Sequence, residues 1–151
     1  MRVRPAAAVF VFLALTPAMA APLAPATLGR PMAVILVDDD EGTIHTIISD
    51  QIQAFLRDDG ETAYSFAAPS LKLYFPSPDA FMAMVRNGYQ PIYRARRFSF
   101  GELKQMDGKF VQSVAIVGPD GDSWRAIYTL VRQDDGSLKI ISCYLVKDAT
   151  A

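Results

Sequence analysis

The fold of this chain is decided by residues 96–146, which read RRFSFGELKQMDGKFVQSVAIVGPDGDSWRAIYTLVRQDDGSLKIISCYLV. Asp-Gly pairs separate four runs rich in β-branched and aromatic residues. Asp and Gly accept the positive φ angles of tight hairpin turns, so such pairs between apolar runs predict hairpins. The three pairs are Asp107-Gly108, Asp120-Gly121 and Asp135-Gly136. Three hairpins in succession predict a four-stranded antiparallel meander.

The expected strands are Arg97 to Met106, Phe110 to Val117, Trp124 to Arg132 and Leu138 to Val146. The middle two alternate, which groups their side chains by face: Phe110, Gln112, Val114 and Ile116 in one strand, and Trp124, Ala126, Tyr128 and Leu130 in the next. The pattern leaves open which faces of neighbouring strands align, because a change of one residue in loop register exchanges them. The fourth is apolar on both faces, which predicts a central strand or a strand covered on both sides.

Helices are expected upstream of the strands. Apolar residues at spacings of three and four predict a first helix from Ile44 to Arg57, with Thr43 as its N-cap. A second helix is expected from Glu61 to Ala67, ended by Pro69. A third begins after Ser77 and reaches Gly88. The pattern of helices followed by a meander predicts an α+β fold.

Gln51 interrupts the apolar stripe of the first helix. A buried amide must find a hydrogen bond or cost about 1–3 kcal/mol in desolvation. Gln51 is therefore either a structural partner of the backbone or a polar group of a pocket.

The N-terminus has the three parts of a secretory signal. Arg2 and Arg4 precede an apolar run, and Ala18-Met19-Ala20 forms a small-residue cleavage site. We expect residues 1–20 to be removed, residues 21–40 to form a leader, and residues 41–148 to form a single domain. The protein is then periplasmic or secreted. Removing the signal changes the formal net charge from −1 to −3, which disfavours nucleic acid as a partner.

Candidate chemical residues are few. The acidic run Asp38 to Glu41 suits a helix N-terminus, with a metal site as the alternative. His45 is expected at the surface. Cys143, the single cysteine, is expected to be a buried and inert thiol. The basic cluster of Arg86, Arg94, Arg96 and Arg97 predicts a solvated face, with an anion site as the alternative.

No catalytic motif is recognisable. Residues with the spacing of a phosphate-binding loop, a dinucleotide fingerprint, a zinc site or a nucleophile elbow are absent from the sequence. We therefore predict no catalytic residue, no metal and no cofactor.

Several segments together carry a family resemblance. They are Gln51 to Phe55 with Asp58-Asp59, Tyr64 to Pro69, Phe81 to Pro91, Val111 to Val114, Asp135 to Ser137, and Ser142-Cys143. With these segments the chain resembles, over about Ile44 to Val146, the bacterial family called domain of unknown function 4864. More broadly, it resembles the cone-shaped fold of nuclear-transport-factor-2-like (NTF2-like) proteins.

The resemblance implies helices packed on a curved antiparallel sheet, often around a pocket. We expect Gln51, Phe55, Tyr64, Tyr128 and Tyr144 to line it. The leading interpretation is a non-catalytic module that binds a small apolar ligand or a protein partner. One alternative is an acid–base enzyme similar to ketosteroid isomerases and polyketide cyclases, and another is a homodimer formed through the open sheet face. A carboxylate enclosed in the pocket would favour the enzyme.

Overall fold

The computed structural model describes residues 36–149, where five helices precede four strands. The predicted signal peptide and most of the predicted leader lie outside these residues. In chain order the elements are α1 (Leu36–Leu56), α2 (Gly60–Ser65), α3 (Pro69–Lys72), α4 (Pro78–Gly88), α5 (Gln90–Tyr93), β1 (Arg97–Met106), β2 (Lys109–Val117), β3 (Ser123–Arg132) and β4 (Leu138–Lys147).

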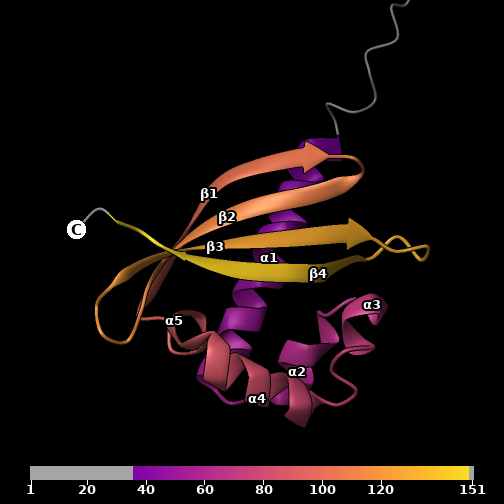
Figure 1. The fold of residues 1–151 in the computed structure, drawn as a ribbon. Helices are drawn as coiled ribbons and strands as arrows, with labels where there is room; N and C mark the ends of the chain where they lie inside the picture. The colour runs from indigo at the N-terminus through magenta and orange to yellow at the C-terminus, as the bar shows by residue number, and fades with distance from the viewer. Residues whose placement is uncertain (1–35, 150–151) are drawn as a thin grey trace, which may run out of the picture. The chain divides into compact units, whose positions relative to one another are not determined.

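The four strands form an antiparallel sheet in the order β1-β2-β3-β4, which confirms the meander (Figure 1). The predicted turn glycines have positive φ angles: 72° at Gly108, 91° at Gly121 and 85° at Gly136. Asp107 also has a positive φ, 50°, so both central residues of the first turn adopt the left-handed conformation that a tight hairpin requires.

One face of the sheet packs on α1, which crosses behind the strands in Figure 1 and extends below β4. Alternate residues of β2 and β3 are buried on this inner face, as the alternation predicts. They are Phe110, Gln112, Val114, Ile116, Ala126, Tyr128 and Leu130. The sheet and the apolar stripe of α1 thus share one core.

The prediction that the fourth strand is central or covered on both faces is wrong. β4 lies at an edge of the sheet, and Tyr144 and Val146 on its outer face are 54% and 48% exposed. A β-bulge breaks the register, because Ile140 pairs with Leu130 while Ser142 pairs with Thr129. Ile141 is the extra residue, and this displacement explains an apolar run without strict alternation.

The first helix begins at Leu36 rather than at Ile44. Thr43 is an interior residue, not the N-cap, and its hydroxyl donates to the Asp39 carbonyl oxygen at 2.9 Å. The acidic run therefore lies near the start of α1, where the helix dipole favours carboxylates. Asp40 also forms an ion pair with Arg132 of β3, which ties this end of α1 to the sheet.

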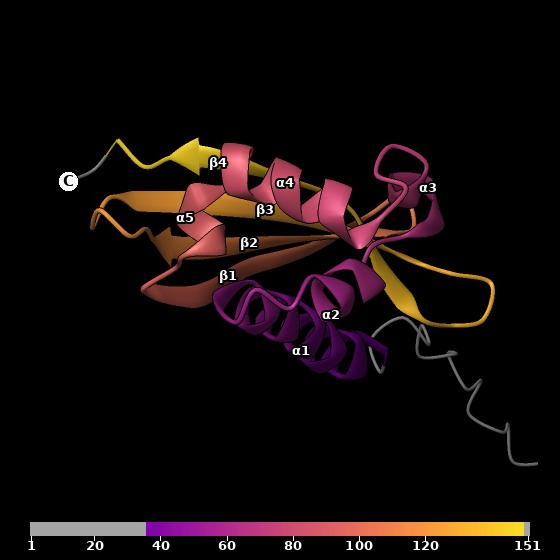
Figure 2. The ribbon, with the colours of Figure 1, turned by 90° about the horizontal axis from the view of Figure 1, so that it is seen from below.

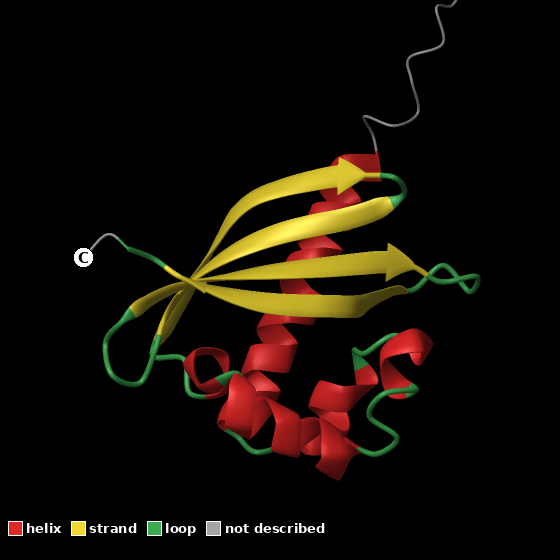
Figure 3. Ribbon diagram, in the orientation of Figure 1, coloured by secondary structure: helices red, strands yellow, loops and turns green. Residues whose placement is uncertain are grey.

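Among the shorter helices, α2 packs against α1 and α4, α3 contacts β4, and α5 contacts α1 and β2 (Figures 2 and 3). Asp59 caps α2 and Ser77 caps α4, both by accepting from a backbone N–H three residues later. Pro69 does not simply end the second helix, because it starts α3. The connection before Pro69 docks on the sheet, where Ala67 forms a parallel bridge with Ile140.

His45 is half-buried rather than fully exposed at the surface. Its ring stacks on Phe100 of β1 with centroids 3.8 Å apart, and its Nε2 lies 3.2 Å from the side-chain oxygen of Gln112. Gln112 is fully buried, and its Nε2 donates to the carbonyl oxygens of Gly101 and Ser113 at 3.0 and 2.8 Å. The amide thus satisfies backbone groups at the irregularity of β1 between Phe100 and Leu103.

Candidate ligand-binding cavity

A cavity of about 320 Å³ lies between α1, α4 and the β3–β4 half of the sheet. Its volume is within the range of small-molecule sites, about 300–1,000 Å³. Apolar side chains dominate its walls. The lining residues are Gln51, Phe55, Leu71, Phe75, Phe81, Met84, Val85, Tyr89, Ile92, Tyr128, Ile140, Ile141, Ser142 and Cys143.

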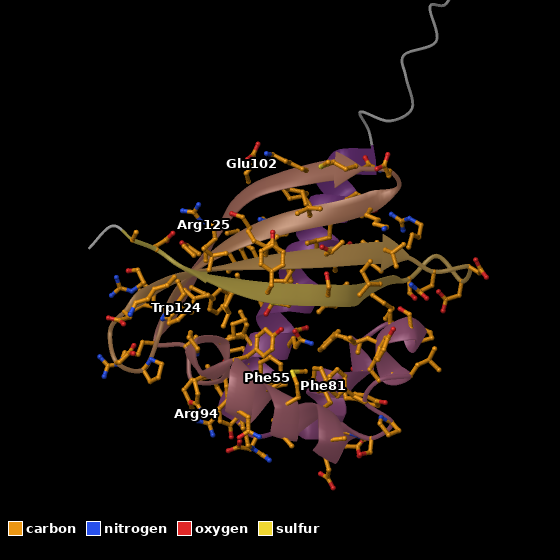
Figure 4. All side chains as sticks on the ribbon, viewed as in Figure 1. Phe55, Phe81, Arg94, Glu102, Trp124 and Arg125 are labelled. Atoms are coloured by element: carbon orange, nitrogen blue, oxygen red, sulfur yellow. The ribbon has the colours of Figure 1, made fainter. Side chains whose placement is uncertain are left out.

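Aromatic rings hold the helical wall in place. Phe81 of α4 is 4% exposed, and its ring centroid lies 5.7–6.2 Å from those of Phe55, Tyr64 and Phe75. Figure 4 shows Phe55 and Phe81 between β4 and the helices below it. The Tyr64 hydroxyl donates to the Phe75 carbonyl oxygen at 2.6 Å, which ties the α3–α4 connection to α2. Rings packed in this way leave few free rotamers, so the wall is preformed.

The sheet wall is shaped by the bulge in β4. The extra residue, Ile141, lines the cavity together with Ile140 and Ser142. Without the extra residue, Cys143 would face away from Tyr128 rather than pair with it. The bulge therefore determines which side chains of β4 reach the cavity.

Three weakly acidic groups cluster at the sheet side of the cavity. Tyr128 and Cys143 are cross-strand partners. The Tyr89 hydroxyl, on the residue that follows α4, donates to the Cys143 carbonyl oxygen at 2.9 Å. Burial raises the pKa of the Cys143 thiol to about 12, and burial followed by its interactions with Cys143 raises the pKa of Tyr128 well above its usual value. Burial also raises the pKa of Tyr89. All three groups are therefore protonated and neutral at physiological pH.

Gln51 reaches the cavity from α1. It is 3% exposed, and its Nε2 donates to the carbonyl oxygen of Ala63 in α2 at 3.2 Å. Gln51 therefore combines the two roles that its position in the apolar stripe left open, since it bonds the backbone and also lines the cavity.

Of the five predicted pocket residues, Gln51, Phe55 and Tyr128 line the cavity. Tyr64 lies behind the wall against Phe81. The placement of Tyr144 in the pocket is wrong. It pairs with Ile127 on the outer face of the sheet, because the bulge inverts the alternation expected along β4.

Several lining residues were not predicted as site residues. In the sequence, Phe81, Met84 and Val85 form only the apolar stripe of a helix. Such a stripe does not show whether its side chains fill the core or line a cavity. Tyr89 and Cys143 come from segments far apart in sequence. A bulge also carries no strong sequence signal here, so the position of Ile141 was not predictable.

Two of the four arginines of the basic cluster, Arg86 and Arg94, have structural partners, whereas Arg96 and Arg97 are exposed as predicted. The Arg94 guanidinium donates to the Asp58 carboxylate at 2.8 Å and to the Phe55 carbonyl oxygen at 2.7 Å. Arg86 Nε donates to the Tyr93 hydroxyl at 3.2 Å, and that hydroxyl donates to Asp58. Arg94 thus binds the C-terminal end of α1 through the Phe55 carbonyl oxygen, and its charge is compensated by Asp58.

Two further properties concern residues 36–149. No group of three or more His, Cys, Asp or Glu side chains in this part of the chain is arranged to hold a metal ion. No helix there has the length and apolarity that crossing a membrane requires.

Comparison with known proteins establishes the family. The family described as "Domain of unknown function (DUF4864)" matches residues 37–151. The chain belongs to this family. The resemblance inferred from the segments between Gln51 and Cys143 is therefore confirmed. A comparison of this DUF4864 chain with curated proteins finds no match.

Two solved structures share the fold of the DUF4864 chain. One is described as an NTF-2 like protein of unknown function from Silicibacter pomeroyi DSS-3; the identity is 13%, the match covers 74% of this chain and 98% of that chain, and the TM-score is 0.53. The other comes from Catenulispora acidiphila, with 18% identity, coverage of 76% and 95%, and a TM-score of 0.50. At these identities the likeness establishes an NTF2-like α+β fold, and a fold does not determine a function.

Proposed function

We propose that this protein binds one small, neutral, apolar molecule in the cavity between α1, α4 and the sheet. The observation that carries the proposal is the character of the lining, since none of the described lining residues is charged. An ionised ligand group would lose its hydration there without gaining a counter-ion, which is costly in an apolar site. A neutral ligand would gain free energy from apolar burial against Phe81, Ile140 and their neighbours.

The lining argues against acid–base catalysis as the main function. A general base must be deprotonated near the working pH and within reach of the substrate. The described lining contains neither a carboxylate nor an imidazole, and His45 packs elsewhere, on Phe100. Its titratable groups are Tyr89, Tyr128 and Cys143, whose pKa values are all raised. These groups can donate hydrogen bonds but do not suit the role of a base.

A cavity-filling substitution tests the proposal. Ile141→Trp should place an indole in the cavity and abolish binding of an apolar fluorescent dye such as 1-anilinonaphthalene. Ile127→Trp is the matched control, because Ile127 is also a partly exposed isoleucine but lies on the outer face of the neighbouring strand.

The measurement is dye fluorescence during titration of the folded proteins, with circular dichroism to verify folding. We expect saturable binding by the wild type and by Ile127→Trp, and none by Ile141→Trp. Equal binding by both variants would place the dye outside the cavity and contradict the proposal. Mass spectrometry of molecules that co-purify with the wild type would identify the natural ligand.

We also propose that the protein is exported. The support is the three-part pattern of residues 1–20, which ends in Ala18-Met19-Ala20. Intact-mass analysis of protein from the cell envelope or medium should show a chain that begins at Ala21. Full-length protein found solely in the cytosol would contradict export.

A further inference from the structure

The orientation of the Gln51 side-chain amide is determined by its neighbour. Gln51 Nε2 lies 3.2 Å from the carbonyl oxygen of Ala63, in a buried contact between α1 and α2. A backbone carbonyl can only accept a hydrogen bond, so the amide nitrogen must face it. The side-chain oxygen of Gln51 therefore points away from Ala63.

This oxygen accepts no hydrogen bond from the described residues. Among the described residues it is also not one of the side-chain atoms that lack both a hydrogen bond and contact with solvent. The oxygen therefore borders space that a water-sized molecule can enter. Because Gln51 is only 3% exposed and lines the cavity, that space is the cavity. Water that enters this space can donate to the oxygen, and an occupant that displaces the water must supply a donor of its own or leave a buried acceptor unpaired. The site therefore favours an occupant that supplies a donor.

Three tyrosine hydroxyls belong to the surroundings of the cavity. The Tyr89 hydroxyl donates to the Cys143 carbonyl oxygen at 2.9 Å, and Tyr128 packs as the cross-strand partner of Cys143. Tyr64, which donates to Phe75, lies outside the lining. None of these groups bonds the Gln51 oxygen.

We infer that the ligand of this cavity is an apolar molecule bearing one hydroxyl or N–H group, and that this group donates a hydrogen bond to the side-chain oxygen of Gln51. This inference rests on the proposed function and narrows it to a chemical class. It excludes pure hydrocarbons as the preferred ligand, because they leave the acceptor unpaired. It also excludes carboxylates and phosphates, because their ionised oxygens can only accept hydrogen bonds and the Gln51 oxygen is itself an acceptor.

A set of probes with one skeleton separates these classes. 2-Naphthol carries a donor. Naphthalene and 2-methoxynaphthalene are neutral and lack the donor, and they are respectively smaller and larger than 2-naphthol. 2-Naphthoate is an anion. Isothermal titration calorimetry of the folded wild type should give a dissociation constant for 2-naphthol about three- to tenfold below that of either neutral probe.

The same titrations on Gln51→Leu assign the preference to the amide. The substitution weakens the contact with Ala63 for every probe alike, so the ratio of two probes on one protein cancels that structural effect. We expect the ratio between 2-naphthol and 2-methoxynaphthalene to fall to about one. Gln53→Leu, at an exposed position of the same helix, should keep the wild-type ratio.

Each outcome supports or overturns one of the two claims. Equal affinities of the wild type for all neutral probes would overturn the Gln51 inference and leave the proposed function intact. A preference for 2-naphthol that persists in Gln51→Leu would also overturn it, by assigning the donor to another acceptor. If no neutral probe binds, or if 2-naphthoate binds as tightly as they do, the proposed function itself fails. The wild-type comparison holds even if Gln51→Leu does not fold.

Discussion

Gln112→Leu should destabilise this protein strongly, although the change preserves most of the side-chain volume. Gln112 is fully buried in β2, and its amide nitrogen donates to the carbonyl oxygens of Gly101 and Ser113 at 3.0 and 2.8 Å. Its oxygen lies 3.2 Å from His45 Nε2. Leucine offers none of these bonds, so the two partly buried carbonyl groups lose a partner.

The magnitude follows from the number and burial of these groups. Each orphaned buried polar group costs about 1–3 kcal/mol. His45 is half-buried and can turn to water, and leucine regains some apolar burial. We therefore expect a net loss of about 2–4 kcal/mol, which lowers the melting temperature of a domain of this size by roughly 10–15 °C.

The assay is urea and thermal unfolding followed by circular dichroism. Gln105→Leu on the neighbouring strand is the control, because Gln105 is exposed and should change stability by less than about 0.5 kcal/mol. Equal stability of Gln112→Leu and the wild type would refute the reasoning, since it would mean that water or backbone rearrangement satisfies both carbonyl groups.

Two further predictions concern titratable groups. Burial raises the pKa of Cys143 from 9.0 to about 12. A thiol reagent at neutral pH should therefore label Cys143 about a thousandfold more slowly in the native protein than after unfolding. Mass spectrometry measures the rate of labelling, and fast labelling of the native protein would contradict the prediction. The Tyr93 hydrogen bond and the Arg94 guanidinium lower the pKa of Asp58 below 3.8, so its stabilising effect is present above pH 3.8 and lost as the pH falls through the folded-state value. The gap in melting temperature between the wild type and Asp58→Asn should therefore be largest at neutral pH and should close in acid, and a gap independent of pH would exclude the carboxylate as its cause.

Local chemistry made the sheet predictable. The Asp-Gly pairs form turns because of their own backbone preferences, without help from distant contacts. The alternation in the strands at Phe110 to Val117 and Trp124 to Arg132 reflects one buried face. The apolar stripe that starts at Ile44 likewise predicted the buried face of α1, including Gln51, which is 3% exposed. The start of α1 was missed, because the polar run from Asp38 to Glu41 lacks the apolar periodicity on which the prediction relied.

The cavity was predictable only in part. Gln51 and Phe55 lie on the apolar stripe of α1, which predicts their inward direction. The alternation groups Tyr128 with Ala126 and Leu130 on one face of β3, but it does not determine which face of the sheet is the inner one. Tyr144 was placed in the pocket, and the bulge at Ile141 reverses that expectation. A bulge forms where the whole strand packs most favourably against its neighbours, and that balance of long-range contacts is not written in the residues next to it.

The sequence by itself determined the α+β class, the order of the strands, the family and the inward face of the first helix, because each depends on backbone preferences or on a repeated local pattern. Only the tertiary structure decided that α4, the α3–α4 connection and the edge strand β4 enclose an apolar cavity. It also decided that the Gln51 amide donates to the Ala63 carbonyl oxygen while the residue lines that cavity. These properties depend on which groups from distant segments meet: the Ala63 carbonyl that orients the amide, and the rings of Phe55, Tyr64 and Phe75 that pack around Phe81.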